Sequence, residues 1–600
     1  MEWKVRLLNR LAPFVGLAFI ALALVLFNSD VLYRIQEQHL FLHTPLFFSQ
    51  CMVTSGGLLS WMGAFLTQFF YYPVLGVVLL CLCWAVLMAL LTVVFRIPAR
   101  WSVVTLVPVV LLLIANVDLG YWIFYLKLRG YFYVATLGTM AAVVLVGCYR
   151  WLSAARPLLG ILFVLVCVAV GYPLFGFYAL LAAVLMAVVS WRDVKHRMAL
   201  LMTLVAVAAV LLVPVIYYHT LYHETNIVNI YWTVLPVFRH YQVNCPTYQI
   251  PYIILVIVLL LMAVVKWPAN RPHSLLAIHL PFVTILFLVT LFFWYKDGNY
   301  YRELQMSRAI GQQDWERVVA ISAEADNPTR DICMMRNLAL FRLGRQGSEM
   351  YRYPDGNCEA KAPFPVRIVQ TDGKMLYLNY GLTNFCYRWC IEDGVKYGWD
   401  VATLNDLIKC SLLTGEKGAA RKYISLLRKT MFYQKACSKY EDYLRNEQLM
   451  LDDPELNPIL MVQKSDDDYL TSDNADIEQF MLNHFASSTN RRNPVYQEQA
   501  LLAALQLRNP QLFWRQFYQY TELHAGEQVP VHYQEAACLF GRLSDQVDTS
   551  RMPFDRQVVK RCDEFLAFME KHKGQSNDAL AAALYDRFHD TYFYHYYFKK

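Results

Sequence analysis

The stretch that organises this chain, residues 30–73, reads DVLYRIQEQHLFLHTPLFFSQCMVTSGGLLSWMGAFLTQFFYYP. Its beginning is too polar to cross a membrane, whereas its second half, from Gly56, is mostly apolar and ends in aromatic side chains. Such a segment favours a helix that lies on the membrane surface, docks on a bundle and turns at Pro73 into a membrane-spanning helix. The stretch is therefore predicted to be a long loop between the first two spans.

Apolar runs of membrane-spanning length recur on both sides of this loop. The chain has 600 residues, 57% of them hydrophobic, which indicates a polytopic membrane block joined to a soluble part. A helix needs about 20 mostly apolar residues to cross the hydrocarbon core of a bilayer. On this criterion we predict nine spans: Leu11–Phe27, Pro73–Phe95, Ser102–Asn116, Tyr131–Cys148, Leu158–Tyr172, Phe175–Trp191, Met198–Tyr218, Tyr252–Lys266 and Leu275–Tyr295.

Basic residues are divided unevenly between the two sets of loops that join these spans. One set, with the N-terminus, carries twelve Lys and Arg residues, and the other carries four: Arg34, Lys127, Arg129 and Arg239. Because basic loops stay in the cytoplasm, the N-terminus is predicted to be cytoplasmic, and nine spans place everything after Lys296 outside. The net charge of +7 is therefore explained by topology, and no nucleic-acid partner is expected.

The predicted fold is all-α, with a transmembrane helical domain over residues 1–295 and an extracytoplasmic helical domain over residues 296–600. The first domain exposes two long external loops, residues 28–72 and 219–251. In the second, apolar residues recur at intervals of three and four, which indicates amphipathic helices. Helical pairs of about 30–40 residues predict a soluble α-solenoid that resembles tetratricopeptide repeats and binds a protein or a glycan chain.

Two acidic residues of the first external loop are the candidate catalytic groups. Asp30 stands where the first span ends, and Glu37 would share its helical face, roughly 10 Å away. Juxtamembrane acids at this place resemble those of the GT-C superfamily of glycosyltransferases, membrane enzymes that use polyprenyl-phosphate sugars. The resemblance implies an acidic general base or metal ligand in this loop, although the paired Asp-Glu of some members is absent. In the alternative interpretation, Asp30 caps a helix and Glu37 is only solvated.

Four cations in otherwise unbasic external loops are candidates for substrate binding: Lys127, Arg129, Arg239 and His240. They can hold a lipid-linked phosphate through charge-assisted hydrogen bonds, or they can meet the head groups of the outer leaflet.

Histidine and cysteine spacing gives one candidate metal site. His219 and His223 are four residues apart beyond the seventh span, where they can bind a divalent metal ion with Glu224, or remain an unliganded pair. Cys386 and Cys390 are one helical turn apart, so they share a side but are poorly placed to bond to each other. No pair has the spacing of a zinc knuckle or a redox motif, and we expect buried free thiols for most of the fourteen cysteines.

Over nearly its whole length the chain resembles an uncharacterised family of bacterial inner-membrane proteins. The resemblance is carried by GGLL at 56–59, FLTQFFYYP at 65–73, YPLFG at 172–176 and VHYQEAA at 531–537. It implies an inner-membrane location with a periplasmic helical domain, and it implies no activity.

Three functions fit this organisation. The preferred one is transfer of a sugar, or a similar group, from a polyprenyl-phosphate donor at the outer face of the membrane. The alternative is a non-catalytic membrane scaffold that presents the helical repeats to a partner. A transporter is disfavoured, because the spans have few ionisable or helix-breaking residues near their midplanes.

Overall fold

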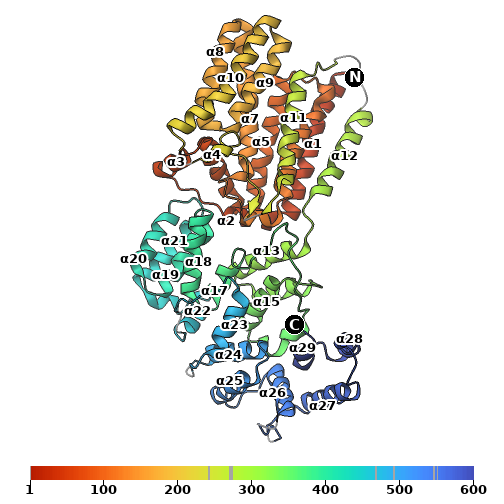
Figure 1. The fold of residues 1–600 in the computed structure, drawn as a ribbon, viewed down its shortest axis with the longest axis vertical. Helices are drawn as coiled ribbons and strands as arrows, with labels where there is room; N and C mark the ends of the chain where they lie inside the picture. The colour runs from red at the N-terminus through yellow and green to blue at the C-terminus, as the bar shows by residue number, and fades with distance from the viewer. Residues whose placement is uncertain are drawn as a thin grey trace.

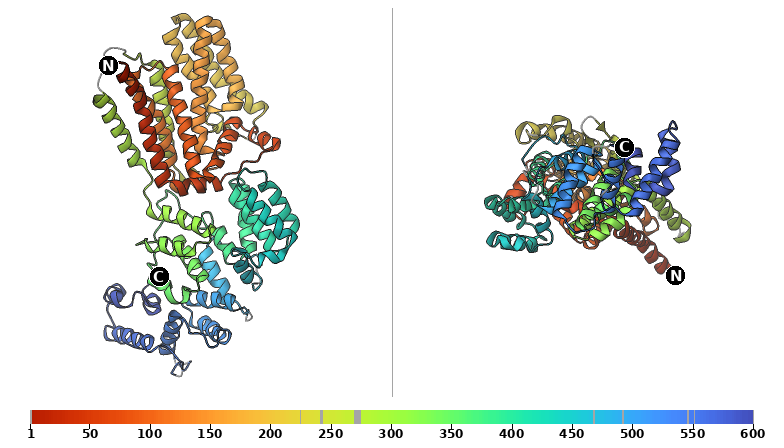
Figure 2. Two further views of the ribbon diagram at one scale, coloured as in Figure 1. Left: turned by 180° about the vertical axis from the view of Figure 1, so that it is seen from behind. Right: turned by 90° about the horizontal axis from the view of Figure 1, so that it is seen from below.

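The computed structural model describes residues 2–223, 225–240, 243–268, 275–466, 469–490, 493–544, 547–550 and 552–599. Within these ranges the regular structure is helical apart from β1 (Arg239–His240) and β2 (Val243–Asn244), two short strands that pair antiparallel. A helical bundle that ends with α12 (Leu275–Phe293) stacks end to end on a helical half that begins with α13 (Gly298–Gly311) (Figure 1). The view from behind shows the same two parts along the long axis (Figure 2). The all-α prediction is confirmed.

The elements of the bundle follow the predicted apolar runs and the loops between them. In chain order they are α1 (Glu2–Phe27), α2 (Ser29–Glu37), α3 (Pro45–Cys51), α4 (Gly57–Thr67), η1 (Gln68–Tyr71), α5 (Pro73–Val94), η2 (Ala99–Thr105), α6 (Leu106–Val117), η3 (Gly120–Phe124), α7 (Tyr131–Ala155), α8 (Pro157–Phe175), α9 (Phe177–Asp193), α10 (His196–Thr220), η4 (Ile227–Asn229), β1 (Arg239–His240), β2 (Val243–Asn244), η5 (Pro246–Gln249), α11 (Ile250–Val264) and α12 (Leu275–Phe293).

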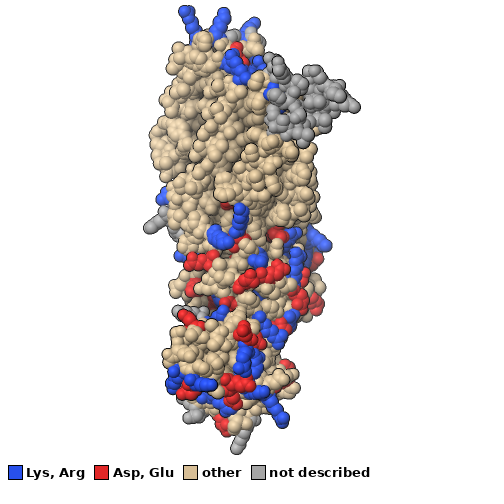
Figure 3. All heavy atoms as spheres, turned by 90° about the vertical axis from the view of Figure 1, so that its right-hand side faces the viewer, with Lys and Arg blue, Asp and Glu red and all other residues tan. Residues whose placement is uncertain are grey.

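Six of these segments are long and apolar enough to cross a membrane, and two sharply bent helix pairs raise the number to eight. The predicted span Phe175–Trp191 corresponds to α9, which has 17 residues and is largely buried against α7, α8, α10 and α11. The structure thus supports six to eight spans among the described residues, and the count of nine stays a prediction. Figure 3 shows few charged side chains on one face of the bundle and many over the helical half.

The apolar end of the first external loop forms α4 and η1, which pack against the bundle. α4 contacts α7 and α8, and Pro73 begins α5. The close approach of α4 to the start of α7 depends on glycine: a Cβ on Gly130, whose φ is +64°, would lie 2.2 Å from the backbone nitrogen of Ala64. No other residue fits this contact without a shift of one helix.

The helical half consists of short helices joined by tight turns. In chain order they are α13 (Gly298–Gly311), α14 (Trp315–Ala323), α15 (Arg330–Arg342), α16 (Gln346–Glu349), η6 (Met350–Arg352), α17 (Gly373–Asn379), α18 (Thr383–Lys396), α19 (Val401–Leu413), α20 (Lys417–Leu427), α21 (Gln434–Arg445), η7 (Glu447–Met450), α22 (Leu456–Gln463), α23 (Ile477–Ser487), α24 (Pro494–Gln506), α25 (Pro510–Leu523), α26 (Val531–Leu543), α27 (Arg556–Lys571), α28 (Asn577–Phe588) and α29 (Tyr592–Phe598).

Most of these helices pack on their neighbours in the sequence, as antiparallel pairs do. Contacts of this kind join α18 to α19, α19 to α20, α23 to α24 and α24 to α25. Other contacts are not between neighbours: α26 packs on both α16 and α29, so the C-terminal segment folds back on the helical half. Helical pairing is therefore present, while the regular solenoid and the likeness to tetratricopeptide repeats stay predictions.

Candidate functional site

Two short helices, α2 and α13, form the junction between the bundle and the helical half, and we call them the junction helices. α1 bends by 74° into α2, α12 bends by 76° into α13, and α2 and α13 contact each other. Arg308 on α13 donates a hydrogen bond to the carboxylate of Asp30 on α2 at 2.7 Å. Because both side chains are partly exposed, this ion pair contributes on the order of 1 kcal/mol or less.

Arg34 is the central charge of the junction. Its Nη2 donates to the Asp372 carboxylate at 3.0 Å and to the Thr371 carbonyl at 2.8 Å, and its Nη1 donates to Glu37 at 3.4 Å. The Ser307 hydroxyl also donates to Asp372, at 2.7 Å. Burial raises the pKa of Glu37, and the charge of Arg34 opposes that rise. Glu37 is therefore held by the same cation that binds the helical half.

Two further carboxyl groups, which the sequence analysis did not select, are buried next to this network. Glu303 accepts hydrogen bonds from the hydroxyls of Tyr121 at 2.7 Å and Thr329 at 2.5 Å. One oxygen of Asp331 accepts from the Thr371 hydroxyl at 2.7 Å, and its Oδ1 has no partner among the described residues. Burial raises the pKa of Glu303 to about 8. Burial, with the charges of neighbouring carboxylates, also raises the pKa of Asp331. Both groups can therefore carry a proton near neutral pH.

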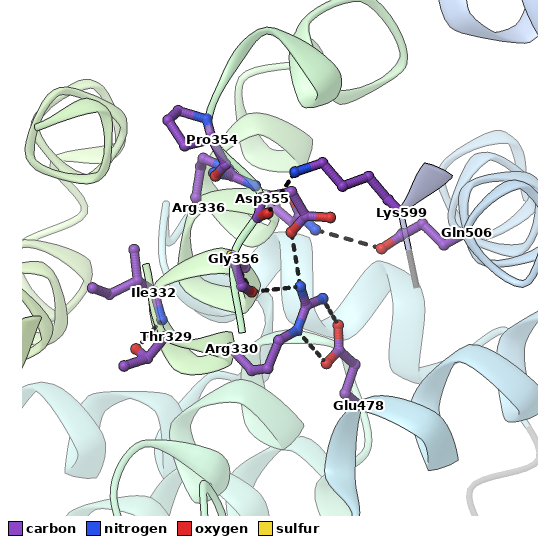
Figure 4. Close-up of polar contacts among 12 residues, drawn as sticks. Thr329, Arg330, Ile332, Arg336, Pro354, Asp355, Gly356, Glu478, Gln506 and Lys599 are labelled. Atoms are coloured by element: carbon purple, nitrogen blue, oxygen red, sulfur yellow. Dashed lines mark hydrogen bonds and ion pairs between the residues drawn. The ribbon is translucent and has the colours of Figure 1, made fainter. Parts of the chain in front are cut away.

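A polar cavity of about 510 Å³ opens beside these two acids. It is lined by Tyr121 from the bundle, by Glu303 and Asp331, and by most of segment 357–366. Arg330 lines it as well, and Figure 4 shows how an ion pair to Asp355 and another to Glu478 hold the Arg330 guanidinium. The volume is that of a small-molecule site, and its charged walls are fixed by contacts within the protein.

A second hollow is an apolar groove of about 790 Å³ on the side of the bundle, between α1, α6 and α12. Phe19, Leu106 and Phe287 are among the side chains that line it. Lys296, which follows α12, also lines it, and its ammonium lies 5.7 Å from the centroid of the Phe292 ring. The groove therefore suits a lipid chain whose anionic head group lies near a cation.

The groove and the cavity both lie near the start of α13, and among the described residues none lines both. Lys361, in the segment that lines the cavity, donates through Nζ to the Lys296 carbonyl at 3.3 Å and through its backbone N–H to Asp297 at 3.2 Å. Tyr295 donates to the Lys361 carbonyl at 2.7 Å. The groove and Glu303 lie on opposite sides of α13, a helix whose width with side chains is about 10 Å.

One family model matches the chain over nearly its whole length. The model of a family of unknown function, DUF6057, matches residues 4–599, which include the bundle, the junction helices and the helical half. This chain belongs to the DUF6057 family. No curated protein and no solved structure matches it.

Two of the predicted substrate-binding cations of this DUF6057 chain contact aromatic rings. The Lys127 ammonium lies 5.7 Å from the centroid of the Tyr397 ring, and the Arg129 guanidinium lies 5.4 Å from that of Phe47. Such cation–π contacts contribute about 0.5–1 kcal/mol at exposed sites. Neither cation lines the groove or the polar cavity, so the structure does not bring them to the buried acids.

His240 packs against a wall of the polar cavity, whereas its neighbour Arg239 is exposed on β1. The centroid of the His240 ring lies 4.2 Å from that of Tyr125 and 5.0 Å from that of Phe364, which lines the cavity. Burial lowers the pKa of His240, and the charge of Lys396 adds to this effect. His240 is therefore neutral near pH 7 and stacks in the wall, which leaves Arg239 as the charged member of the pair.

The predicted metal ligands lie at the end of α10. His219 is in the last turn of this helix and His223 follows in a turn, both exposed. Glu224 lies outside the described residues. The metal-binding role of this trio stays a prediction.

Neither Glu303 nor Asp331 has a local sequence context that identifies it as a candidate functional residue. Asp331 follows Thr329, the N-cap of α15, and acidic residues are favoured in the first turn of any helix because of the helix dipole. Glu303 lies in the middle of α13, where an acid is expected to be solvated. The sequence pointed to this region only indirectly. Asp30 and Glu37 lie on α2, and α2 contacts α13, the helix that carries Glu303.

Proposed function

We propose that this protein is a membrane transferase that moves a sugar, or a similar group, from a polyprenyl-phosphate donor to an acceptor on the side of the membrane where the helical half lies. The observation that supports it best is the presence, on the two sides of α13, of an apolar groove and of a polar cavity lined by two buried carboxyl groups. The resemblance of the juxtamembrane loop to GT-C glycosyltransferases favours the same chemistry.

In this proposal the lipid chain of the donor lies in the groove, with its phosphate near Lys296 and Lys361. Ammonium groups bind phosphate through charge-assisted hydrogen bonds and stabilise the charge that develops on a leaving phosphate. The other cations, Lys127, Arg129 and Arg239, then contact lipid head groups around the site.

Glu303 is the proposed general base. As the acceptor hydroxyl attacks the anomeric carbon, its proton passes to the Glu303 carboxylate, the bond from that carbon to the phosphate oxygen breaks, and the phosphate leaves with the electron pair. A pKa of about 8 suits a group that exchanges protons near neutral pH. Asp30 and Glu37 act as positioning residues, because they hold Arg308 and Arg34 in the junction.

The variant Glu303→Gln tests this role. We expect it to lower the amount of transferred product by about 100-fold, because an amide does not take up the acceptor proton. Mass spectrometry of lipid-linked saccharides and their acceptors, extracted from cells that carry each variant, measures the effect.

The matched control is Glu324→Gln, at an exposed acid that follows α14, and it should leave the products at the wild-type level. Wild-type products in cells with Glu303→Gln and in a deletion strain would exclude the proposed activity.

The proposal includes an orientation: nine spans, a cytoplasmic N-terminus, and a helical half outside the cytoplasm of a bacterial cell. The division of twelve basic loop residues against four supports it. A reporter that is active only outside the cytoplasm, fused after Lys600, should be active, and a reporter that requires the cytoplasm should be inactive there. The opposite result would place the cavity in the cytoplasm and contradict the use of a donor at the outer face.

A membrane scaffold is the second candidate function, favoured by the contacts that fix the helical half to the bundle. The Tyr433 hydroxyl donates to the Gln36 side chain at 3.0 Å, and the His43 backbone N–H donates to the Lys429 carbonyl at 3.1 Å. In this function the bundle anchors the helical half, which recruits a protein or a glycan chain. A recurrent crosslinked partner on the helical half, with unchanged products in the Glu303→Gln cells, would favour the scaffold.

A further inference from the structure

Four side chains with metal-binding atoms come together between α18 and α19. Cys386 and Cys390 are one turn apart on α18, Asp406 and Cys410 are one turn apart on α19, and the two helices pack on each other. Residues four apart project from the same face of a helix. Two facing helices that each supply such a pair form a type of site that binds metals in helical bundles.

The ligand atoms of three of them are close enough to share one ion. The sulfur atoms of Cys386 and Cys390 and a carboxylate oxygen of Asp406 all lie within 4.8 Å of one another. Cys386 is also in hydrogen-bonding contact with both Cys390 and Cys410. In a tetrahedral site with zinc–sulfur bonds of about 2.3 Å, the sulfur atoms lie roughly 3.8 Å apart. Small side-chain shifts therefore bring these three groups to bonding distance, and Cys410, beside Cys386, is the candidate fourth ligand.

Asp406 is the observation that separates this cluster from ordinary packing of cysteines. In the described part of the chain, Asp406 accepts no hydrogen bond and forms no ion pair, and its side chain is only partly buried. The three cysteines beside it are fully buried. A carboxylate oxygen within 4.8 Å of two buried thiol sulfurs completes a set of ligand atoms that a metal ion can bind.

We infer that Cys386, Cys390, Asp406 and Cys410 form a zinc-binding site inside the helical half. Thiolates favour Zn²⁺ over Mg²⁺ and Ca²⁺, and four protein ligands leave no open position, which makes the site structural. Lys374 and Lys409 lie near the cluster, where their positive charge acts on Cys390 and Asp406, and each also forms an ion pair with another acid, Asp393 and Glu455 respectively.

The location gives this site a role in the architecture. α19 contacts the junction helix α2 as well as α18. Because a structural zinc ion contributes its binding free energy to folding, the site stabilises the α18–α19 pair against which the bundle docks. It is distinct from the polar cavity, since none of its four ligands lines that cavity.

Metal analysis of the full-length protein, purified in detergent without chelators, tests the inference. We expect about one zinc ion per chain in the wild type. Cys390→Ser and Asp406→Asn should each retain roughly tenfold less zinc. Cys437→Ser is the control, because Cys437 is an equally buried thiol of the helical half outside the cluster, and it should retain the wild-type content.

Cobalt exchange in the wild type keeps the test decisive if the Cys390→Ser protein does not fold. Bound Co²⁺ should show sulfur-to-metal charge-transfer absorption and the visible bands of tetrahedral coordination. A wild-type protein that contains no zinc and takes up no cobalt would overturn the inference. A Cys386–Cys410 disulfide in the purified protein, found by mass spectrometry, would also overturn it.

Discussion

Replacing Arg34 by methionine is expected to lower the free energy of unfolding by about 3–5 kcal/mol. The change removes the guanidinium that pairs with Asp372 at 3.0 Å, and the Asp372 side chain is 1% exposed, so water does not replace the lost cation. The Ser307 hydroxyl still donates to this carboxylate, but a neutral donor does not balance its charge. Loss of one partner of a buried ion pair is among the most destabilising single changes.

Pulse proteolysis in urea measures this effect on the detergent-solubilised protein, because cleavage follows the unfolded fraction. Arg445→Ala is the matched control: Arg445 and its partner Asp442 are both exposed, and its loss should cost less than about 0.5 kcal/mol. The double variant Arg34→Met/Asp372→Leu should recover part of the stability, because it leaves no unpaired buried charge. A single variant as stable as the control would show that Arg34 is not essential to the junction.

The membrane half could be predicted from the sequence to the extent that its helices contact lipid. Apolar runs located α5, α8 and α10, and basic loops gave the bundle an orientation to test. The exact number of spans was not settled in this way, because α9 is short and buried among other helices. A hydropathy pattern does not separate a helix that faces lipid from one that is enclosed by protein.

The acids of the first external loop show where sequence reasoning ends. The sequence shows that Asp30 and Glu37 are acidic and that they follow the first predicted span. These two properties led to the catalytic hypothesis. The contacts that hold this loop could not be predicted from the sequence, because the interacting residues are far apart in the chain. Arg308 is 278 positions from Asp30, and Asp372 is 338 positions from Arg34. The polar cavity could not be predicted for the same reason. Its walls come from segments that are far apart in the sequence: η3, α13, α15 and segment 357–371.

The proposed zinc site also could not be predicted from the sequence, although its residues are closer together in the chain. Cys386 and Cys390 alone match no zinc motif, and the sequence analysis therefore expected free thiols. The two other ligands lie on the next helix of an antiparallel pair, so the four-residue spacing on each helix has meaning only after the pair is folded.

The contribution of Glu303 to stability is expected to fall by up to about 5 kcal/mol as the pH rises from about 4.5 to about 8. Burial raises the pKa of this carboxyl group from 4.5 in the unfolded chain to about 8 in the native protein. Between these values the native protein keeps a proton that the unfolded chain has released, so deprotonation favours unfolding. Below pH 4.5 the contribution is fully present, and above pH 8 the loss is complete.

The comparison of the wild type with Glu303→Gln measures the titration of Glu303 together with its effect on the neighbouring Asp331, because glutamine does not titrate. Two histidines act in the opposite direction: burial lowers the pKa of His39 to about 4 and that of His595 to about 3, so their neutral forms stabilise the fold as the pH rises toward 6.5. They occur in both proteins and cancel in the difference. Urea pulse proteolysis at a series of pH values should therefore show a wild-type minus variant difference that declines between pH 4.5 and 8. A difference that is independent of pH would mean that Glu303 is ionised in the native protein throughout this range, held by Tyr121 and Thr329.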